Sequence, residues 1–164
     1  MGLFAIPTLE MEEVQFQMPS YMELALLEAE KAAQRGEVPV GAVLVSSTGN
    51  ILARSGNQTE SDADPTAHAE MLVLKKASQN RGSPRLTDCD LYVTLEPCAM
   101  CAAAISLARL RRVVFAAYDP KGGAVEHGPR FFSQPTCHHA PEIVGGVEEK
   151  RAQEMLKKFF AGKR

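Results

Sequence analysis

The chain has 164 residues, a net charge of −2 at pH 7 and an apolar fraction of 45%, values typical of one globular domain. A domain of this size buries roughly two-thirds of the surface of its unfolded chain and therefore needs no disulfides for stability. The four cysteines are also too few for a disulfide-rich scaffold. The net charge excludes a globally basic protein, so a nucleic acid would have to bind a local basic patch.

The sequence contains no apolar run long enough to span a bilayer, so we expect no membrane contact. The first Lys or Arg is Lys31, which leaves a secretory signal peptide without its basic segment. A Cys-x-x-Cys pair in such a chain indicates a cytoplasmic location and either metal or redox chemistry. We expect no organic cofactor.

The first predicted helix follows an extension. Residues 1–19 show no apolar period, so we interpret them as an N-terminal extension of a single domain, residues 20–164. Ser20 and Glu23 form a capping-box pattern at the start of a helix. Gly36 ends this helix.

A β-hairpin and a second helix are predicted next. Residues 38–45 and 51–55 are rich in β-branched and apolar side chains and flank a Ser-Ser-Thr-Gly-Asn turn. Pro39 is expected at the beginning or the edge of the first strand. Residues 67–78 predict a helix and residues 79–87 a loop.

The second half of the chain predicts two strands around a helix. Residues 90–94 and 112–118 form the strands, and the helix between them starts near Pro97 and runs to about Ala108. Such a crossover joins parallel strands and is right-handed. Residues 119–141 predict an irregular, functional loop.

The last predicted elements are a short strand at residues 142–144 and a helix at residues 148–161. The order of elements predicts the α/β class, with a three-layer α/β/α architecture around a mixed five-stranded sheet.

Two short segments carry the candidate metal ligands. They are Thr66-Ala67-His68-Ala69-Glu70 and Glu96-Pro97-Cys98-Ala99-Met100-Cys101, each at the start of a predicted helix. Thiolates and imidazole suit zinc, so His68, Cys98 and Cys101 are the candidate ligands of one Zn²⁺ per subunit. Three protein ligands leave a fourth position for water, which is typical of catalytic zinc sites.

Glu70 is the candidate catalytic residue. It lies two residues after His68, so it need not bind the metal and can reach water and substrate. A carboxylate there can take a proton from water and later return it to a leaving group. His-x-Glu followed by Pro-Cys-x-x-Cys is the known signature of zinc-dependent base deaminases.

Each feature has a simpler interpretation when taken alone. A Cys-x-x-Cys pair can be a redox pair or half of a structural zinc site, and a carboxylate such as Glu70 is often a solvated helix-start residue. A zinc-stabilised binding module without activity would need four protein ligands. The combination of the two segments favours catalysis.

These segments resemble the cytidine deaminase superfamily, and within it the branch of adenosine deaminases that edit tRNA. The resemblance runs from about Tyr21 to the end and includes the segments 37–45, 64–70, 91–98 and 112–115. Ala103 and Ala116 stand where this branch often has Gly, which weakens the assignment to the branch but removes no reactive group.

The resemblance implies hydrolysis of adenosine to inosine at the wobble position of a tRNA anticodon. It also implies a homodimer in which the partner subunit completes each RNA site. Asn57 is expected to hold the base, and the backbone carbonyl of Glu96 is expected to lie near the leaving amino group. Ala69, Asp119, Lys121, Phe159 and Phe160 are expected to contact the substrate or other parts of the RNA. The implied substrate-binding residues are Asn57, Ala69, Glu96, Asp119, Lys121, Phe159 and Phe160.

The RNA assignment has alternatives. The last 15 residues are basic, which suits phosphate binding, but a solvated amphipathic helix has the same pattern. Phe159 and Phe160 can be core residues instead of a stacking surface. The same zinc residues would also serve a deaminase of a free base or nucleoside, namely guanine, cytosine or cytidine.

Three other features receive no catalytic role from the sequence. Cys89 is expected to be a buried thiol at a strand edge. The run Cys137-His138-His139 is interpreted as loop or rim, because adjacent residues seldom converge on one ion. His127 has no assignment.

Overall fold

One mixed sheet with the strand order β2-β1-β3-β4-β5 forms the centre of the protein. The computed structural model describes residues 17–163, so residues 1–16 of the predicted extension lie outside the described part. The strands are β1 (Gly41–Val45), β2 (Ile51–Gly56), β3 (Asp90–Leu95), β4 (Arg112–Ala117) and β5 (Glu142–Gly145). β1 pairs antiparallel with β2 and β3, whereas β4 runs parallel to β3 and β5. The predicted hairpin and parallel crossover are confirmed.

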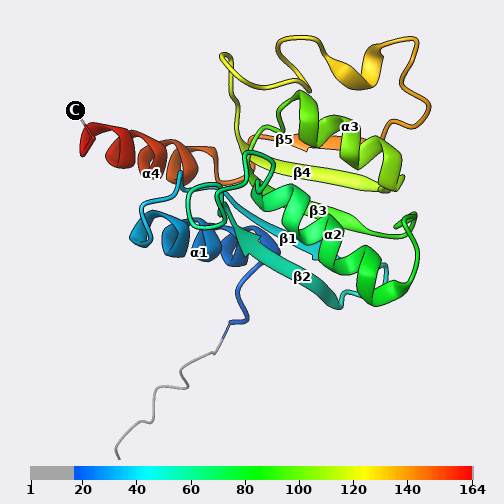
Figure 1. Cartoon of the computed structure of the whole chain (residues 1–164), viewed down its shortest axis with the longest axis horizontal. Helices are drawn as coiled ribbons and strands as arrows, with labels where there is room; N and C mark the ends of the chain where they lie inside the picture. The colour runs from blue at the N-terminus through cyan, green and yellow to red at the C-terminus, as the bar shows by residue number, and fades with distance from the viewer. Residues whose placement is uncertain (1–16, 164) are drawn as a thin grey trace, which may run out of the picture.

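Helices cover both faces of this sheet, as Figure 1 shows. They are α1 (Tyr21–Gln34), α2 (Ala69–Arg81), α3 (Ala99–Ala108) and α4 (Glu149–Ala161). Val73 of α2 and Ile105 of α3 pack in one apolar cluster with Phe115. Leu26 of α1 and Ala152 of α4 pack in a second cluster on the other face. The predicted three-layer α/β/α architecture is confirmed.

The helix starts at the two motif segments were predicted two residues too early. α2 begins at Ala69 because His68 is extended, with φ −71° and ψ 151°. α3 begins at Ala99 because Cys98 is extended, with φ −73° and ψ 175°. His68 and Cys98 are therefore the N-cap residues of their helices. At its other end α2 continues to Arg81, where a loop was predicted, and Gly82 in the left-handed conformation (φ 69°) ends it.

The first strand also starts later than predicted, at Gly41 instead of Val38. Pro39 has no N–H to donate to a ladder, and the N–H of Val40 is used locally by the carbonyl of Val38. Gly41 passes so close to α1 that a Cβ atom there would lie 2.0 Å from the carbonyl oxygen of Ala25. Only glycine permits this approach.

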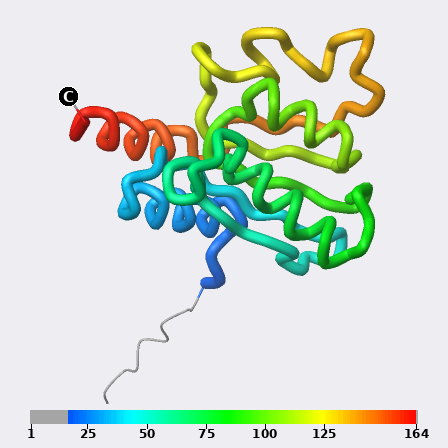
Figure 2. The backbone as a smooth tube through the Cα atoms, in the orientation of Figure 1, coloured from blue at the N-terminus to red at the C-terminus, as the bar shows by residue number. Residues whose placement is uncertain are grey.

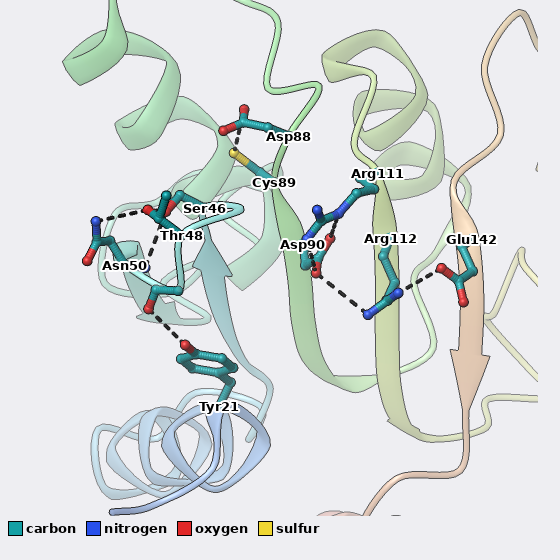
Figure 3. A network of polar contacts seen from close by, with 11 residues as sticks. Tyr21, Ser46, Thr48, Asn50, Asp88, Cys89, Asp90, Arg111, Arg112 and Glu142 are labelled. Atoms are coloured by element: carbon teal, nitrogen blue, oxygen red, sulfur yellow. Dashed lines mark hydrogen bonds and ion pairs between the residues drawn. The ribbon is translucent and has the colours of Figure 1, made fainter.

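Ion pairs join β3, β4 and β5 at the end of the sheet where β3 begins (Figure 3). The carboxylate of Asp90 accepts two hydrogen bonds from Arg111, each of 2.8 Å, and Nε of Arg112 lies 2.9 Å from Oε2 of Glu142. Cys89, next to Asp90, is fully buried, as predicted.

The segment between β4 and β5 is irregular, as predicted, apart from one 3-10 turn, η1 (Phe131–Ser133). Figure 2 shows this segment as the yellow-to-orange stretch beside α3, and η1 packs on that helix. Among residues 17–163, no helix has the length and apolar character needed to cross a bilayer.

Candidate metal centre

Three ligand atoms meet where α2 and α3 begin. Nδ1 of His68 lies 3.7 Å from Sγ of Cys98 and 3.6 Å from Sγ of Cys101. All three atoms lie within 4.8 Å of one another. None of the four cysteines forms a disulfide. The structure thus brings together the three residues that the sequence predicted as ligands.

The chemistry of this donor set fits zinc. Two sulfurs and one imidazole nitrogen are ligands that zinc prefers, and the positive ends of two helix dipoles favour thiolates over thiols at these positions. In residues 17–163 no fourth His, Cys, Asp or Glu joins the group. The described part of the chain therefore lacks the four-ligand set that a purely structural zinc module needs.

The three groups also influence one another's protonation. Hydrogen bonds from the Cys101 thiol and from His68 lower the pKa of Cys98 to about 4, against the effect of burial. The same bond to Cys98, together with burial, raises the pKa of Cys101. The hydrogen bond to Cys98 raises the pKa of His68. The lowered pKa of Cys98 favours its thiolate form, which attracts a cation.

Glu70 lies in the first turn of α2, two residues beyond His68, and is only 4% exposed. It is outside the group of three ligands. Burial raises the pKa of Glu70 to about 7, and the negative charge of Cys98 acts in the same direction. The carboxyl group thus lies beside the metal centre and is not one of the three candidate ligands.

Asn57 follows β2 directly and lies against the start of α2. Its Oδ1 accepts a hydrogen bond of 2.8 Å from the N–H of Ala69, and its own N–H donates to the carbonyl of Val40. Because the side-chain oxygen is used as an acceptor, the Nδ2 group is available as a donor. Asn57 and Ala69, both predicted to bind substrate, are therefore in contact.

A buried carboxylate that the sequence did not identify holds the loop between β2 and α2. Glu37 is 1% exposed and accepts hydrogen bonds from the N–H of Ser61 (2.8 Å), the N–H of Glu60 (3.1 Å) and the hydroxyl of Thr59 (3.3 Å). Burial alone would raise the pKa of Glu37, but these donors outweigh it and lower the pKa. No local pattern marks Glu37, because its partners lie more than 20 positions away.

Asp119 and Lys121 follow β4, at the same edge of the sheet as the segment that follows β3. Oδ1 of Asp119 accepts from the N–H of Lys121 (3.2 Å) and of Gly122 (3.0 Å). The carboxylate of Asp119 thus closes a turn, and this turn presents the exposed side chain of Lys121.

Phe159 and Phe160 lie on α4, on the face of the sheet opposite to α2 and α3, so they are not part of the metal centre. Neither is a core residue: Phe160 is 51% exposed and Phe159 is partly exposed. Their rings pack edge to face at 5.3 Å, and Nζ of Lys163 lies 4.6 Å from the centre of the Phe159 ring.

Cys137 and His139 hold the long loop to α3. The hydroxyl of Ser106 donates to the carbonyl of His139 (2.7 Å), and the Cys137 thiol reaches the same oxygen at 3.2 Å. Nε2 of His139 lies 2.7 Å from the carbonyl of Leu110. These contacts give the two side chains a structural role.

Comparison with known proteins agrees with this geometry. Residues 17–117 match the model of the cytidine and deoxycytidylate deaminase zinc-binding region. The chain belongs to this deaminase family. The three donor residues of this deaminase therefore fit Zn²⁺, and the predicted metal is confirmed.

Similar members of the family include two bacterial proteins called tRNA-specific adenosine deaminase. The protein of Agrobacterium fabrum is 59% identical over 144 residues, which cover 88% of this chain and 94% of that protein. The protein of Bacillus subtilis is 47% identical over 140 residues, which cover 85% of this chain and 86% of that protein.

Two solved structures of similar proteins resemble this deaminase. One comes from a study of A-to-I editing by tRNA:A34 deaminases; it is 60% identical with a TM-score of 0.81, and the match covers 83% of this chain and 98% of that one. The other is a guanine deaminase from Bacillus subtilis, 32% identical with a TM-score of 0.59, and the match covers 87% of this chain and 91% of that one.

Proposed function

We propose that this deaminase hydrolyses adenosine to inosine at the wobble position of a tRNA anticodon and releases ammonia. The observation that carries the proposal is the convergence of His68, Cys98 and Cys101 beside the buried Glu70. It occurs in a chain that is 59% identical to a tRNA-specific adenosine deaminase over 88% of its length.

Glu70 performs the proton transfers in this reaction. Zinc, when bound, supplies the Lewis acidity that makes water nucleophilic near neutral pH. Glu70 accepts a proton from the attacking water and passes it to N1 of adenine as the new C6–O bond forms. It then delivers the second proton of the water to the departing amino group, so that the C6–N bond breaks and ammonia leaves.

The substrate base is held by groups on both sides of the metal ligands. Nδ2 of Asn57 donates to the base, since Oδ1 of the same side chain is already used by Ala69. Ala69 is fully buried and shapes the floor of the site. The carbonyl of Glu96, two residues before Cys98, accepts from the leaving amino group.

RNA outside the reacting base is bound by charged and aromatic side chains. Asp119 and Lys121 contact the nucleotides beside the flipped base. The exposed Phe160 and its neighbour Phe159 offer rings on which bases can stack, worth about 1–3 kcal/mol for each base. Lys157 and Lys158 on α4 are exposed, which supports contacts of this helix with phosphates.

The enzyme acts as a cytoplasmic homodimer with one Zn²⁺ per subunit. The dimer is what the resemblance to the tRNA-editing deaminases implies. Light scattering coupled to gel filtration tests the dimer: a mass of one chain would contradict it.

A deaminase of free guanine is the alternative, since a guanine deaminase shares 32% identity and the fold. The higher identity to the tRNA-specific enzymes favours RNA. Kinetics on free guanine, cytosine, cytidine and adenosine separate the two: turnover of one of these together with none on tRNA would overturn the RNA assignment.

The decisive experiment is mass spectrometry of nucleosides from bulk tRNA after incubation with the purified, zinc-loaded protein. We expect inosine at the wobble adenosine of an anticodon and no inosine in tRNA incubated with Glu70→Ala. Unchanged tRNA with the active-site residues intact and zinc bound would contradict the proposal.

A further inference from the structure

The side chain of Glu96 lies at the centre of a set of hydrogen bonds that does not involve its carbonyl. It is 2% exposed. Oε1 accepts from the N–H groups of Val125 (3.2 Å), Glu126 (2.8 Å) and His127 (3.1 Å). Oε2 accepts from the N–H of Asp119 at 2.8 Å and lies 2.9 Å from Nδ1 of His127. One carboxylate therefore binds both ends of the segment 119–127.

This segment is also attached to the residue that precedes the metal ligand Cys98. The N–H of Ala124 donates to the carbonyl of Pro97 at 2.9 Å. The backbone wraps tightly around the carboxylate: a Cβ atom on Gly123 would lie 2.5 Å from Cδ of Glu96. The segment is thus joined to the backbone that carries the metal ligand.

We propose that the side chain of Glu96 is a positioning residue, which holds the segment 119–127 beside the metal centre so that Asp119 and Lys121 stay in place for the RNA substrate. The assignment of substrate contacts to Asp119 and Lys121 rests on the proposed function. The anchoring of segment 119–127 by Glu96 is independent of the proposed function.

Only an ionised carboxylate satisfies this set of donors. It is acceptor-only on both oxygens, with about four lone-pair sites, and hydrogen bonds to a charged acceptor are stronger than neutral ones. In Glu96→Gln the carboxamide oxygen can serve the three N–H groups on the Oε1 side, but its NH₂ group then faces the N–H of Asp119. In Glu96→Ala all these donors lose their acceptor in a buried place.

The test compares Glu96→Gln and Glu96→Ala with Glu126→Gln. Glu126 is exposed and lies in the same segment, so this control removes the same charge without touching the anchor. Backbone amide exchange, followed by NMR on the zinc-loaded full chain, reports on the anchor itself. Zinc content and steady-state kinetics on an anticodon stem-loop are measured on the same samples.

We expect amide exchange at Asp119 to accelerate about tenfold or more in Glu96→Gln, since a lost charged hydrogen bond is worth roughly 1.5–3 kcal/mol. Exchange at residues 125–127 accelerates most in Glu96→Ala. KM for the stem-loop rises more than kcat falls, zinc content stays at the wild-type value, and Glu126→Gln behaves like the wild type.

Unchanged exchange at Asp119 and residues 125–127 in both Glu96 variants would overturn the anchor. Faster exchange with unchanged kinetics would overturn the positioning role, and so would loss of zinc, since Glu96 would then act through Cys98. If Glu96→Ala does not fold, Glu96→Gln and His127→Phe, which removes only the contact at Nδ1, carry the test. A wild-type protein inactive on tRNA but with the expected exchange pattern would refute the proposed function and leave the anchor standing.

Discussion

Oδ1 of Asn57 accepts a hydrogen bond of 2.8 Å from the backbone N–H of Ala69, which ties the end of β2 to the first turn of α2. The N–H of Ala69 is one of the helix-start donors that have no partner within the helix. Asn57 therefore performs a capping role through its oxygen and is free to bind substrate through its nitrogen. The two roles reside on different atoms and can be separated by substitution.

Asn57→Asp is expected to separate these roles. The variant keeps an oxygen for Ala69, and a negative charge at a helix start is favourable, so the free energy of unfolding should change by less than about 1 kcal/mol. The Nδ2 donor is lost, and kcat/KM on the stem-loop should fall about 100-fold, as expected for a hydrogen bond worth roughly 2.7 kcal/mol. Asn57→Ala should lose both stability and activity. Near-normal activity of Asn57→Asp would show that Nδ2 does not bind the base.

Glu70→Gln and Glu70→Ala are expected to lose activity while zinc content is retained. General acid–base catalysis raises reaction rates about 10²–10⁴-fold. The rate of the chemical step in single-turnover assays should therefore fall by about 10²-fold or more. Glu60→Gln, on the exposed loop before α2, is the matched control and should remain active. Turnover of Glu70→Ala near the wild-type rate would contradict the proposed mechanism.

Metal content should depend on three side chains. Cys98→Ser, Cys101→Ser and His68→Ala should each lose most of the one zinc expected per chain, because a site with two remaining ligands binds zinc far more weakly. Cys137→Ser should retain it, since Cys137 is a free thiol outside the ligand group. Atomic emission of dialysed protein measures this. A chelator should also lower the melting temperature of the wild type, whereas insensitivity to chelation would argue against the metal centre.

The stability contributed by Glu37 should depend on pH. The folded state lowers the pKa of Glu37 below its ordinary value of 4.5. The unfolded chain therefore binds the proton more readily, and the contribution is fully present above pH 4.5 and is lost as the pH falls toward the folded pKa. Urea titrations should show Glu37→Gln less stable by about 2 kcal/mol at pH 7, with a difference that narrows below pH 4.5. A difference independent of pH would mean that the charge of Glu37 contributes nothing.

Gly123→Ala is expected to disturb the Glu96 anchor from the opposite side. The new Cβ would lie 2.5 Å from both Cδ of Glu96 and the carbonyl oxygen of Asp119, so the segment must shift. Amide exchange at Asp119 and His127 should accelerate as in Glu96→Gln. Gly162→Ala is the control, because its nearest contacts would be ordinary ones at 3.6 Å or more. Equal exchange in both variants would show that the packing around Gly123 tolerates a methyl group.

Local patterns in the sequence were sufficient to predict the helices and strands of this deaminase, apart from several of their ends, and to indicate three candidate metal ligands. The capping box of Ser20 and Glu23 is present in the structure, and Cys98 and Cys101 are close because they lie three positions apart at the start of one helix. Interactions of this kind are set by backbone geometry within one or two turns. The order of the elements was sufficient to predict the parallel crossover, because connections between strands follow a general topological rule.

Only the tertiary structure decided which distant side chains meet. Cys101 and His68 are 33 positions apart and come within 3.6 Å because the sheet places the starts of α2 and α3 side by side. Glu37 and Glu96 look like ordinary surface carboxylates in the sequence, yet both are buried, and their donors lie 22 to 31 positions away. Whether a buried carboxylate is satisfied depends on how the loops close over it, and loop closure is a property of the whole fold that no short segment encodes.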